Sequence, residues 1–112
     1  MDVKIRESGI IRIVDLAGRL DTGTSPEAEA AISKLLDAGH NKIVISLGGT
    51  DYVSSSGLRV LLVTAKKLSA MSGKLKICKP NAVVKEILDI SGFSTILDVR
   101  ASEEEALSEL QF

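Results

Sequence analysis

The sequence contains few aromatic residues, a single cysteine and almost no net charge. It has no Trp, one Tyr and two Phe in 112 residues, too few to build a surface that stacks nucleobases. Lys and Arg number 14 and Asp and Glu number 15, so the net charge is −1 and no basic field is available for nucleic acid. The single cysteine, Cys78, excludes an internal disulfide and favours a reducing compartment.

Long apolar runs are also missing. No run approaches the roughly 18–20 residues that span a bilayer, and residues 1–7 alternate charged and apolar side chains instead of forming a signal peptide. With 45% hydrophobic residues, the chain can bury a core without a metal or a disulfide. We therefore expect a single cytoplasmic domain over residues 1–112 that does not enter a membrane.

Catalytic and cofactor motifs are absent as well. The only histidine, His40, is predicted in a turn between a helix and a strand, where it has no serine partner for a Ser-His-Asp triad. The serine cluster at 54–56 lacks the first glycine of G-x-S-x-G, which disfavours a serine hydrolase. One His and one Cys cannot form a usual zinc site, and neither glycine-rich nucleotide motif occurs. We expect no enzyme activity, no metal and no cofactor, with Cys78 as a small core residue.

Strand periodicity opens the chain and returns between helical segments. The alternation at Val3 and Ile5, followed by the turn signal Ser8-Gly9, predicts a hairpin with a second strand over 10–16 and a loop over 17–24. The next run, 43–47, is mostly apolar, as in a central strand, and Gly48-Gly49 is predicted to end it. Two further strands are predicted over 74–78 and 95–99.

Four helices are predicted between and after these strands. The first begins with Ser25 as N-cap and Pro26 at the first helical position, and Gly39 ends it. The second follows the serine cluster with helical spacing from Leu58 to Leu68. The third begins at Pro80-Asn81 and the last is an acidic helix over 102–110. The order ββαβαβαβα predicts an α/β domain with a mixed, mostly parallel sheet of about five strands and four helices.

The serine cluster, Ser54, Ser55 and Ser56, lies where a strand meets the second helix. The first turn of a helix has unpaired N–H groups and a partial positive charge, which suits an N-cap serine and also suits an anion. On spacing alone, two interpretations stay open. One hydroxyl caps the helix, or one serine is a phosphoacceptor whose phosphate brings about −1.5 to −2 charges.

A second polar loop precedes the first helix and contains Asp21, Thr22 and Thr24. If the strand over 10–16 is parallel to the strand over 43–47, both loops leave the same edge of the sheet and these side chains lie beside the serines. Ordinary turn chemistry is the alternative explanation of this composition.

Three stretches resemble the STAS domain family, and within it the bacterial anti-sigma factor antagonists. Residues 18–21, GRLD, are similar to the family's Gly-x-Leu/Ile-Asp after its second strand. Residues 44–58, VISLGGTDYVSSSGL, are similar to its strand, loop and phosphorylation motif. Residues 80–88 and 91–96 are similar to its late helix and the strand that follows. The resemblance covers nearly the whole chain and agrees with the predicted order of elements.

The resemblance implies a partner switch. The chain would bind an anti-sigma factor that is an ATP-dependent serine kinase and so free a sigma factor. Phosphorylation of Ser55 would abolish binding, and a PP2C-type phosphatase would restore it. The chain would be a monomer that supplies only the hydroxyl. The implied partner surface consists of Asp21, Thr22, Thr24, Tyr52, Ser54, Ser56, Gly57 and Arg59.

Two positions depart from the family pattern. Ser54 stands where members commonly have Asp immediately before the acceptor, and Arg59 stands where the residue is often small. Arg59 follows Ser55 by four residues, so its guanidinium can reach a phosphate on the same helix face. An alternative function is a non-switching STAS domain that serves as a structural or ligand-sensing subunit of a transport system. Neighbouring genes for a kinase and phosphatase, or for a permease, would discriminate between the two.

Overall fold

In the computed structural model, which describes residues 1–111, one five-stranded sheet carries helices on both faces. The strands lie in the order β1-β2-β3-β4-β5. β1 is antiparallel to β2, and the other neighbours are parallel. This is the predicted mixed, mostly parallel sheet. The strands are β1 (Asp2–Ser8), β2 (Ile11–Leu20), β3 (Lys42–Val53), β4 (Lys74–Cys78) and β5 (Val99–Arg100).

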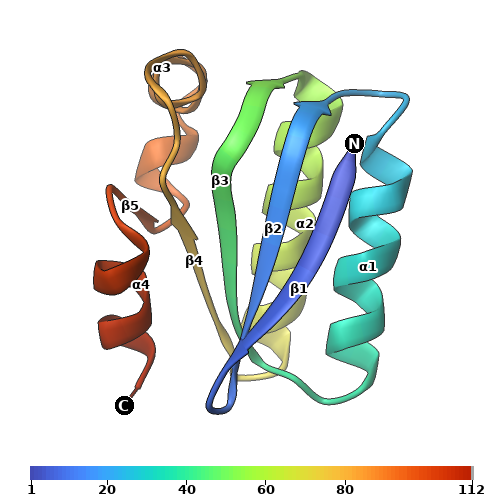
Figure 1. The fold of residues 1–112 in the computed structure, drawn as a ribbon, viewed down its shortest axis with the longest axis vertical. Coiled ribbons are helices and arrows are strands. Elements are labelled where there is room, and N and C mark those ends of the chain that lie inside the picture. The colour runs from blue at the N-terminus through green and yellow to red at the C-terminus, as the bar shows by residue number, and fades with distance from the viewer. Residues whose placement is uncertain (112) are drawn as a thin grey trace.

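The helices divide unequally between the two faces of the sheet. The larger core packs α1 (Ser25–Asp37), α2 (Ser55–Ala70) and α3 (Ala82–Ile90) against one face, through residues such as Ile32, Leu61 and Leu88. α4 (Glu103–Leu110) covers part of the other face through Ala106 and Leu110. Figure 1 shows α2 behind β2 and β3, with α1 next to it to the right of β1, and α4 apart from both near β4 and β5.

Two strands are longer than predicted, and both reach toward the serine cluster. A loop was predicted over 17–24, but residues 17–20 belong to β2, which continues to the fully buried Leu20. Gly48-Gly49 does not end β3, which continues to Val53. The register shifts twice along this pair, between Asp15 and Ala17 and between Gly18 and Arg19, so β3 has an extra residue at each place. A Cβ at Gly49 would lie 3.0 Å from the Ala17 Cβ, so glycine permits the close pairing.

The fifth strand is present but lies at Val99–Arg100 and not over the predicted range 95–99. A 3₁₀ turn, η1 (Phe93–Thr95), occupies its start, and β5 is only two residues long. Gly92 has φ 81°, and its carbonyl accepts hydrogen bonds from the Thr95 hydroxyl and backbone N–H. These local bonds close the turn, and Leu97 is then buried in the core without strand pairing.

Helix starts differ from the predictions by one to three residues. Thr24, not Ser25, is the N-cap of α1, and α2 begins at Ser55 rather than at Leu58. Asn81 and Ser102 cap α3 and α4, each accepting a hydrogen bond from a backbone N–H three residues on. His40 lies in the turn before β3, and Cys78 is fully buried, as predicted. Burial raises the pKa of the Cys78 thiol. Within residues 1–111, no helix has the length and apolar character to cross a membrane.

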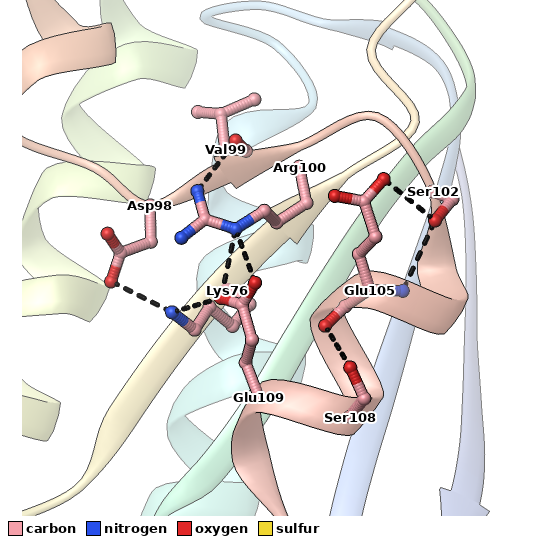
Figure 2. A network of polar contacts seen from close by, with 8 residues as sticks. All are labelled: Lys76, Asp98, Val99, Arg100, Ser102, Glu105, Ser108 and Glu109. Atoms are coloured by element: carbon pink, nitrogen blue, oxygen red, sulfur yellow. Dashed lines mark hydrogen bonds and ion pairs between the residues drawn. The ribbon is translucent and has the colours of Figure 1, made fainter.

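Polar contacts fasten α4 to the sheet. Arg6 of β1 binds the carboxylates of Asp15 and Glu103, and its hydrogen bonds hold the pKa of Glu103 below its usual value. Glu109 accepts hydrogen bonds from Arg100 at 2.8 and 2.9 Å, and its Oε1 lies 2.9 Å from the Lys76 ammonium (Figure 2). These contacts, that from Arg100 first, lower the pKa of Glu109 to about 2.

Acid is therefore expected to loosen α4. A carboxylate whose pKa is lowered on folding stabilises the protein above its unfolded pKa, here 4.5, and this contribution is lost as the pH falls toward about 2. We expect hydrogen exchange in α4 to accelerate over this range. We also expect Glu109→Gln to flatten the pH dependence of unfolding there. Glu86→Gln, a change at an exposed glutamate of α3, should leave the slope as in the wild type. Equal slopes in all three proteins would contradict the role of Glu109.

Candidate functional site

The ends of β2 and β3 bring the two predicted polar loops together. Because the strands are parallel, the loop after Leu20 and the serine cluster after Val53 leave the same edge of the sheet, at the top of Figure 1. The Ser54 backbone N–H donates to the Leu20 carbonyl at 2.9 Å. The Thr22 hydroxyl lies 3.0 Å from the Ser56 hydroxyl. The predicted proximity of the two loops is therefore confirmed for Thr22. The backbone hydrogen bond between Ser54 and Leu20 keeps the loops together.

Ser54 is the N-cap of α2. Its backbone is extended, with φ −84° and ψ 178°, and its Oγ accepts a hydrogen bond from the Gly57 N–H at 3.3 Å. Its carbonyl accepts the first helical bond, from Leu58. Asp and Ser cap helices about equally well. Ser54 therefore meets the needs of the helix end as well as the Asp that the resemblance led us to expect at this position.

The cap gives a stability prediction. We expect Ser54→Ala to lower the free energy of unfolding by about 1 kcal/mol, because it removes the acceptor for the Gly57 N–H. Ser54→Asp should be at least as stable as the wild type, since its carboxylate keeps the acceptor and also interacts favourably with the helix dipole. Urea denaturation of the three proteins measures both effects. An alanine variant as stable as the wild type would show that the Ser54 bond contributes nothing.

The three serines differ in what their hydroxyls do. Ser54 caps the helix, and Ser56 is half-buried with its hydroxyl against Thr22. Ser55, the first residue of α2, is exposed, and its hydroxyl has no hydrogen-bond partner among residues 1–111. The sequence allowed a cap or an acceptor in the cluster. In the structure, Ser54 is the cap, and the hydroxyl of Ser55 is exposed and unbonded.

Gly57 permits the helix to sit this close to β2. A Cβ at this position would lie 2.6 Å from the Leu20 carbonyl oxygen, 2.8 Å from Leu20 Cγ and 2.9 Å from Val53 Cγ1. Any larger residue would push the start of α2 away from the strand ends. Gly57 is therefore a structural part of the site, since it holds the serine cluster against Leu20.

Asp21 and Thr24 shape the first loop rather than meeting the serines. The Asp21 carboxylate accepts hydrogen bonds from the backbone N–H groups of Gly23 and Thr24, at 3.0 and 3.2 Å. The Thr24 hydroxyl donates to the Arg19 carbonyl at 2.6 Å. Lost hydration raises the pKa of Asp21, but these bonds from Thr24 and Gly23 outweigh it and hold the pKa below its usual value. The turn-chemistry interpretation is thus correct for these two residues.

Arg19 is a site residue that the sequence predictions missed. Its guanidinium lies over the Tyr52 ring, 4.5 Å from the centroid, and 3.6 Å from the Asp21 carboxylate. The pairing of Arg19 with Tyr52 across the β2–β3 register brings them together. Residue 19 was assigned to a loop, so no cross-strand partner was considered. Arg59 is exposed on α2 and, like Ser56, lines a groove between α1 and α2.

The geometry suits binding rather than metal chemistry. Residues 1–111 contain no group of three or more His, Cys, Asp or Glu side chains that could hold a metal ion. The rim presents hydroxyls, one stacked Arg–Tyr pair and the N-terminal end of α2, which Ser54 caps. Such a surface can accept an anion or a partner protein.

Comparisons with known proteins agree with this arrangement. Residues 2–106 match the family described as "STAS domain". BtrV of Bordetella bronchiseptica, named as a candidate anti-sigma factor antagonist, is 38% identical over 84% of this chain and 81% of its own length. The anti-sigma-B factor antagonist of Bacillus subtilis is 30% identical over 93% of each chain.

Solved structures share the fold. A candidate anti-sigma factor antagonist of Thermotoga maritima superposes with a TM-score of 0.92 at 20% identity, covering 98% of this chain and 95% of its own. SpoIIAA superposes in its unphosphorylated form with a TM-score of 0.77 (20% identity, 98% of both chains). In its phosphorylated form, from Bacillus, it superposes with a TM-score of 0.75 (21% identity, 98% of this chain and all of that one). With its sequence match and its fold in agreement, the chain belongs to the STAS domain family, among the anti-sigma factor antagonists, which are partner-switching regulators and not enzymes.

Proposed function

We propose that this chain, in the cytoplasm, binds an anti-sigma factor serine kinase in its unphosphorylated form and thereby releases a sigma factor. Phosphorylation of Ser55 abolishes that binding, and a PP2C-type phosphatase restores it. The observation that carries the proposal is the state of Ser55, an exposed serine with an unengaged hydroxyl at the N-terminus of a 16-residue helix.

The choice of Ser55 over its neighbours follows from their contacts. A kinase needs the acceptor hydroxyl to reach the γ-phosphate, so a hydroxyl committed to the fold is a poorer acceptor. Ser54 would lose its bond to the Gly57 N–H, and Ser56 would lose its contact with Thr22. Ser55 has no such bond to lose. Its phosphate would also lie at the positive end of the α2 dipole, so the domain would stay folded.

Three of the predicted residues, Thr22, Tyr52 and Ser56, would contribute to the partner surface near the acceptor. The Thr22 hydroxyl lies 3.0 Å from that of Ser56, the residue after Ser55, and Tyr52 with its stacked Arg19 lies near the end of β3. The kinase supplies all catalytic groups in this scheme. A phosphorylated form is named for SpoIIAA, which has the same fold, and this supports the existence of such a state here.

Mass spectrometry with the kinase encoded nearest the gene tests the proposal. The wild-type protein incubated with that kinase and ATP should gain one phosphate. Ser55→Ala should gain none, while Ser54→Ala and Ser56→Ala, the matched neighbours, should still be modified. Unmodified wild-type protein, or a Ser55→Ala variant that is modified as fully as the wild type, would overturn the assignment.

A further inference from the structure

β1 leaves one edge of the sheet unpaired (Figure 1). It is the outermost strand, with β2 on its inner side. The two-residue turn Gly9-Ile10 closes the hairpin at the Ser8–Ile11 pair, and hydrogen-bonded pairs then recur at every second residue of the antiparallel ladder. The backbone N–H and C=O groups of Val3 and Ile5 therefore point away from β2. They have no backbone partner elsewhere in residues 1–111, so this edge can accept another strand.

The two unpaired charges of β1 have opposite signs. Arg6 and Glu7 each contact oppositely charged neighbours within the fold. Asp2 and Lys4 are exposed, and their side chains form no hydrogen bond or ion pair with any residue in 1–111. They lie two residues apart, so both project from the same face of the strand. A lysine on an edge strand usually discourages pairing, but here the strand also carries the charge that would neutralise it.

One antiparallel register of β1 with the β1 of a second copy matches both features. Centred on Val3, it aligns the outward N–H and C=O groups of Val3 with those of the other Val3. It places Asp2 opposite Lys4 of the other copy, and the two-fold symmetry repeats this pair. Ile5, which is 40% exposed, lies opposite Met1 of the other copy on the face of the sheet that carries α1.

Charge selects this register over its neighbours. Pairing centred on Lys4 would place two lysines opposite each other, and pairing centred on Ile5 would place Lys4 opposite Arg6. Pairing centred on Asp2 would oppose two carboxylates. Like charges directly opposite each other destabilise a ladder, whereas opposite charges stabilise it. Only the register centred on Val3 places an acidic residue opposite Lys4.

We propose that two copies of this chain associate through β1 in this register, so that their two sheets become one. The pairing covers residues 1–5 of each copy, and so short a contact gives a weak, reversible dimer in place of the expected monomer. A two-fold axis perpendicular to the sheet relates the copies and keeps both α1 helices on one face of it. The sheet edges that carry Ser55 then lie at opposite ends of the dimer, and both stay accessible. The assignment does not rest on the proposed function, because Ser55 lies outside the interface.

Sedimentation equilibrium of the whole chain at constant ionic strength, over concentrations up to about 1 mM, tests the assignment. We expect a reversible equilibrium between monomer and dimer. Asp2→Lys should weaken association by about tenfold, and so should Lys4→Asp, because each turns two favourable cross-strand pairs into two unfavourable ones. The double variant Asp2→Lys/Lys4→Asp keeps the wild-type net charge and restores both pairs in reverse, so it should associate as the wild type does. A general loss of structure cannot produce this recovery.

Two further variants separate backbone pairing from charge. Val3→Pro removes an N–H that points away from β2, so the ladder with β2 is kept and the circular dichroism spectrum should be unchanged, while association is lost. Glu7→Lys makes the same charge change as Asp2→Lys at an exposed β1 residue beyond the paired stretch, and it should associate as the wild type does. A monomer at every concentration, a double variant as weak as the single ones, or a Val3→Pro variant that associates normally would overturn the assignment.

Discussion

We expect phosphorylation of Ser55 to weaken binding to the anti-sigma partner by about 100-fold or more. Ser55 lies at the exposed rim formed by the ends of β2 and β3, where a partner that covers the start of α2 must exclude water from it. A phosphate brings about −1.5 to −2 charges to that surface. An unfavourable charge at an interface costs several kcal/mol, and about 2.8 kcal/mol corresponds to 100-fold.

Calorimetric titration of the partner with phosphorylated and unphosphorylated protein measures this effect. Ser55→Glu, with a single charge, should give a smaller loss in the same direction. Ser69→Glu is the matched control, because Ser69 is an exposed serine near the other end of the same helix. If the phosphorylated protein binds as tightly as the unmodified one, Ser55 does not control the interaction, whatever the kinase does to it.

Gly57→Ala is expected to lower the free energy of unfolding by about 1–2 kcal/mol. The added methyl group would overlap two atoms of Leu20 and one of Val53, all within 3.0 Å. The Leu20 carbonyl cannot move alone, because it accepts the Ser54 N–H and is part of β2. The helix must therefore shift, and overpacking of this kind costs 1–3 kcal/mol. The intrinsic preference of alanine for helices, about 1 kcal/mol over glycine, offsets part of the cost.

Gly48→Ala separates this overlap from a general effect of replacing glycine. Its Cβ would first meet the Lys79 side chain, with Cε at 3.2 Å, and this flexible chain can move away. We expect a change of less than about 0.5 kcal/mol, as for ordinary surface substitutions. Urea denaturation of both variants gives the comparison. If Gly57→Ala is as stable as Gly48→Ala, the close contact of α2 with Leu20 does not determine the helix position.

The periodic parts of the fold were predictable and the pairing details were not. Helical spacing located the four helices, an apolar run located β3 and the alternation of polar and apolar residues located β4, because these patterns follow directly from which side chains face the core. Gly48-Gly49 was interpreted as the end of a strand. In the structure β3 continues through both glycines, and the absence of a side chain at Gly49 lets it pair closely with Ala17 of β2. Such pairing depends on a partner strand more than thirty residues away, so the local sequence contains no signal for it.

The sequence predicted where the site lies, but it did not predict what each residue of the site does. The serine cluster and Thr22 were expected at one edge, and the parallel pairing of β2 and β3 places them there. The sequence could not say which serine caps the helix, because three adjacent hydroxyls are equivalent until the backbone angles are known. Ser54 has the extended backbone that capping requires. Arg19 was missed for the same reason as the second half of β2, since its contact with Tyr52 depends on strand pairing.

The neutral cap at Ser54 also affects how distinct the two signalling states are. No acidic residue lies in the first turn of α2, and the cap itself is uncharged. In an antagonist with Asp at this position, the helix end already carries a negative charge before any phosphate arrives. Here, under the proposed switch, one modification changes the helix end from uncharged to about doubly negative. The unmodified helix end therefore presents no negative charge of its own to the partner, and binding of the unmodified form should depend less strongly on ionic strength than in an Asp-capped relative.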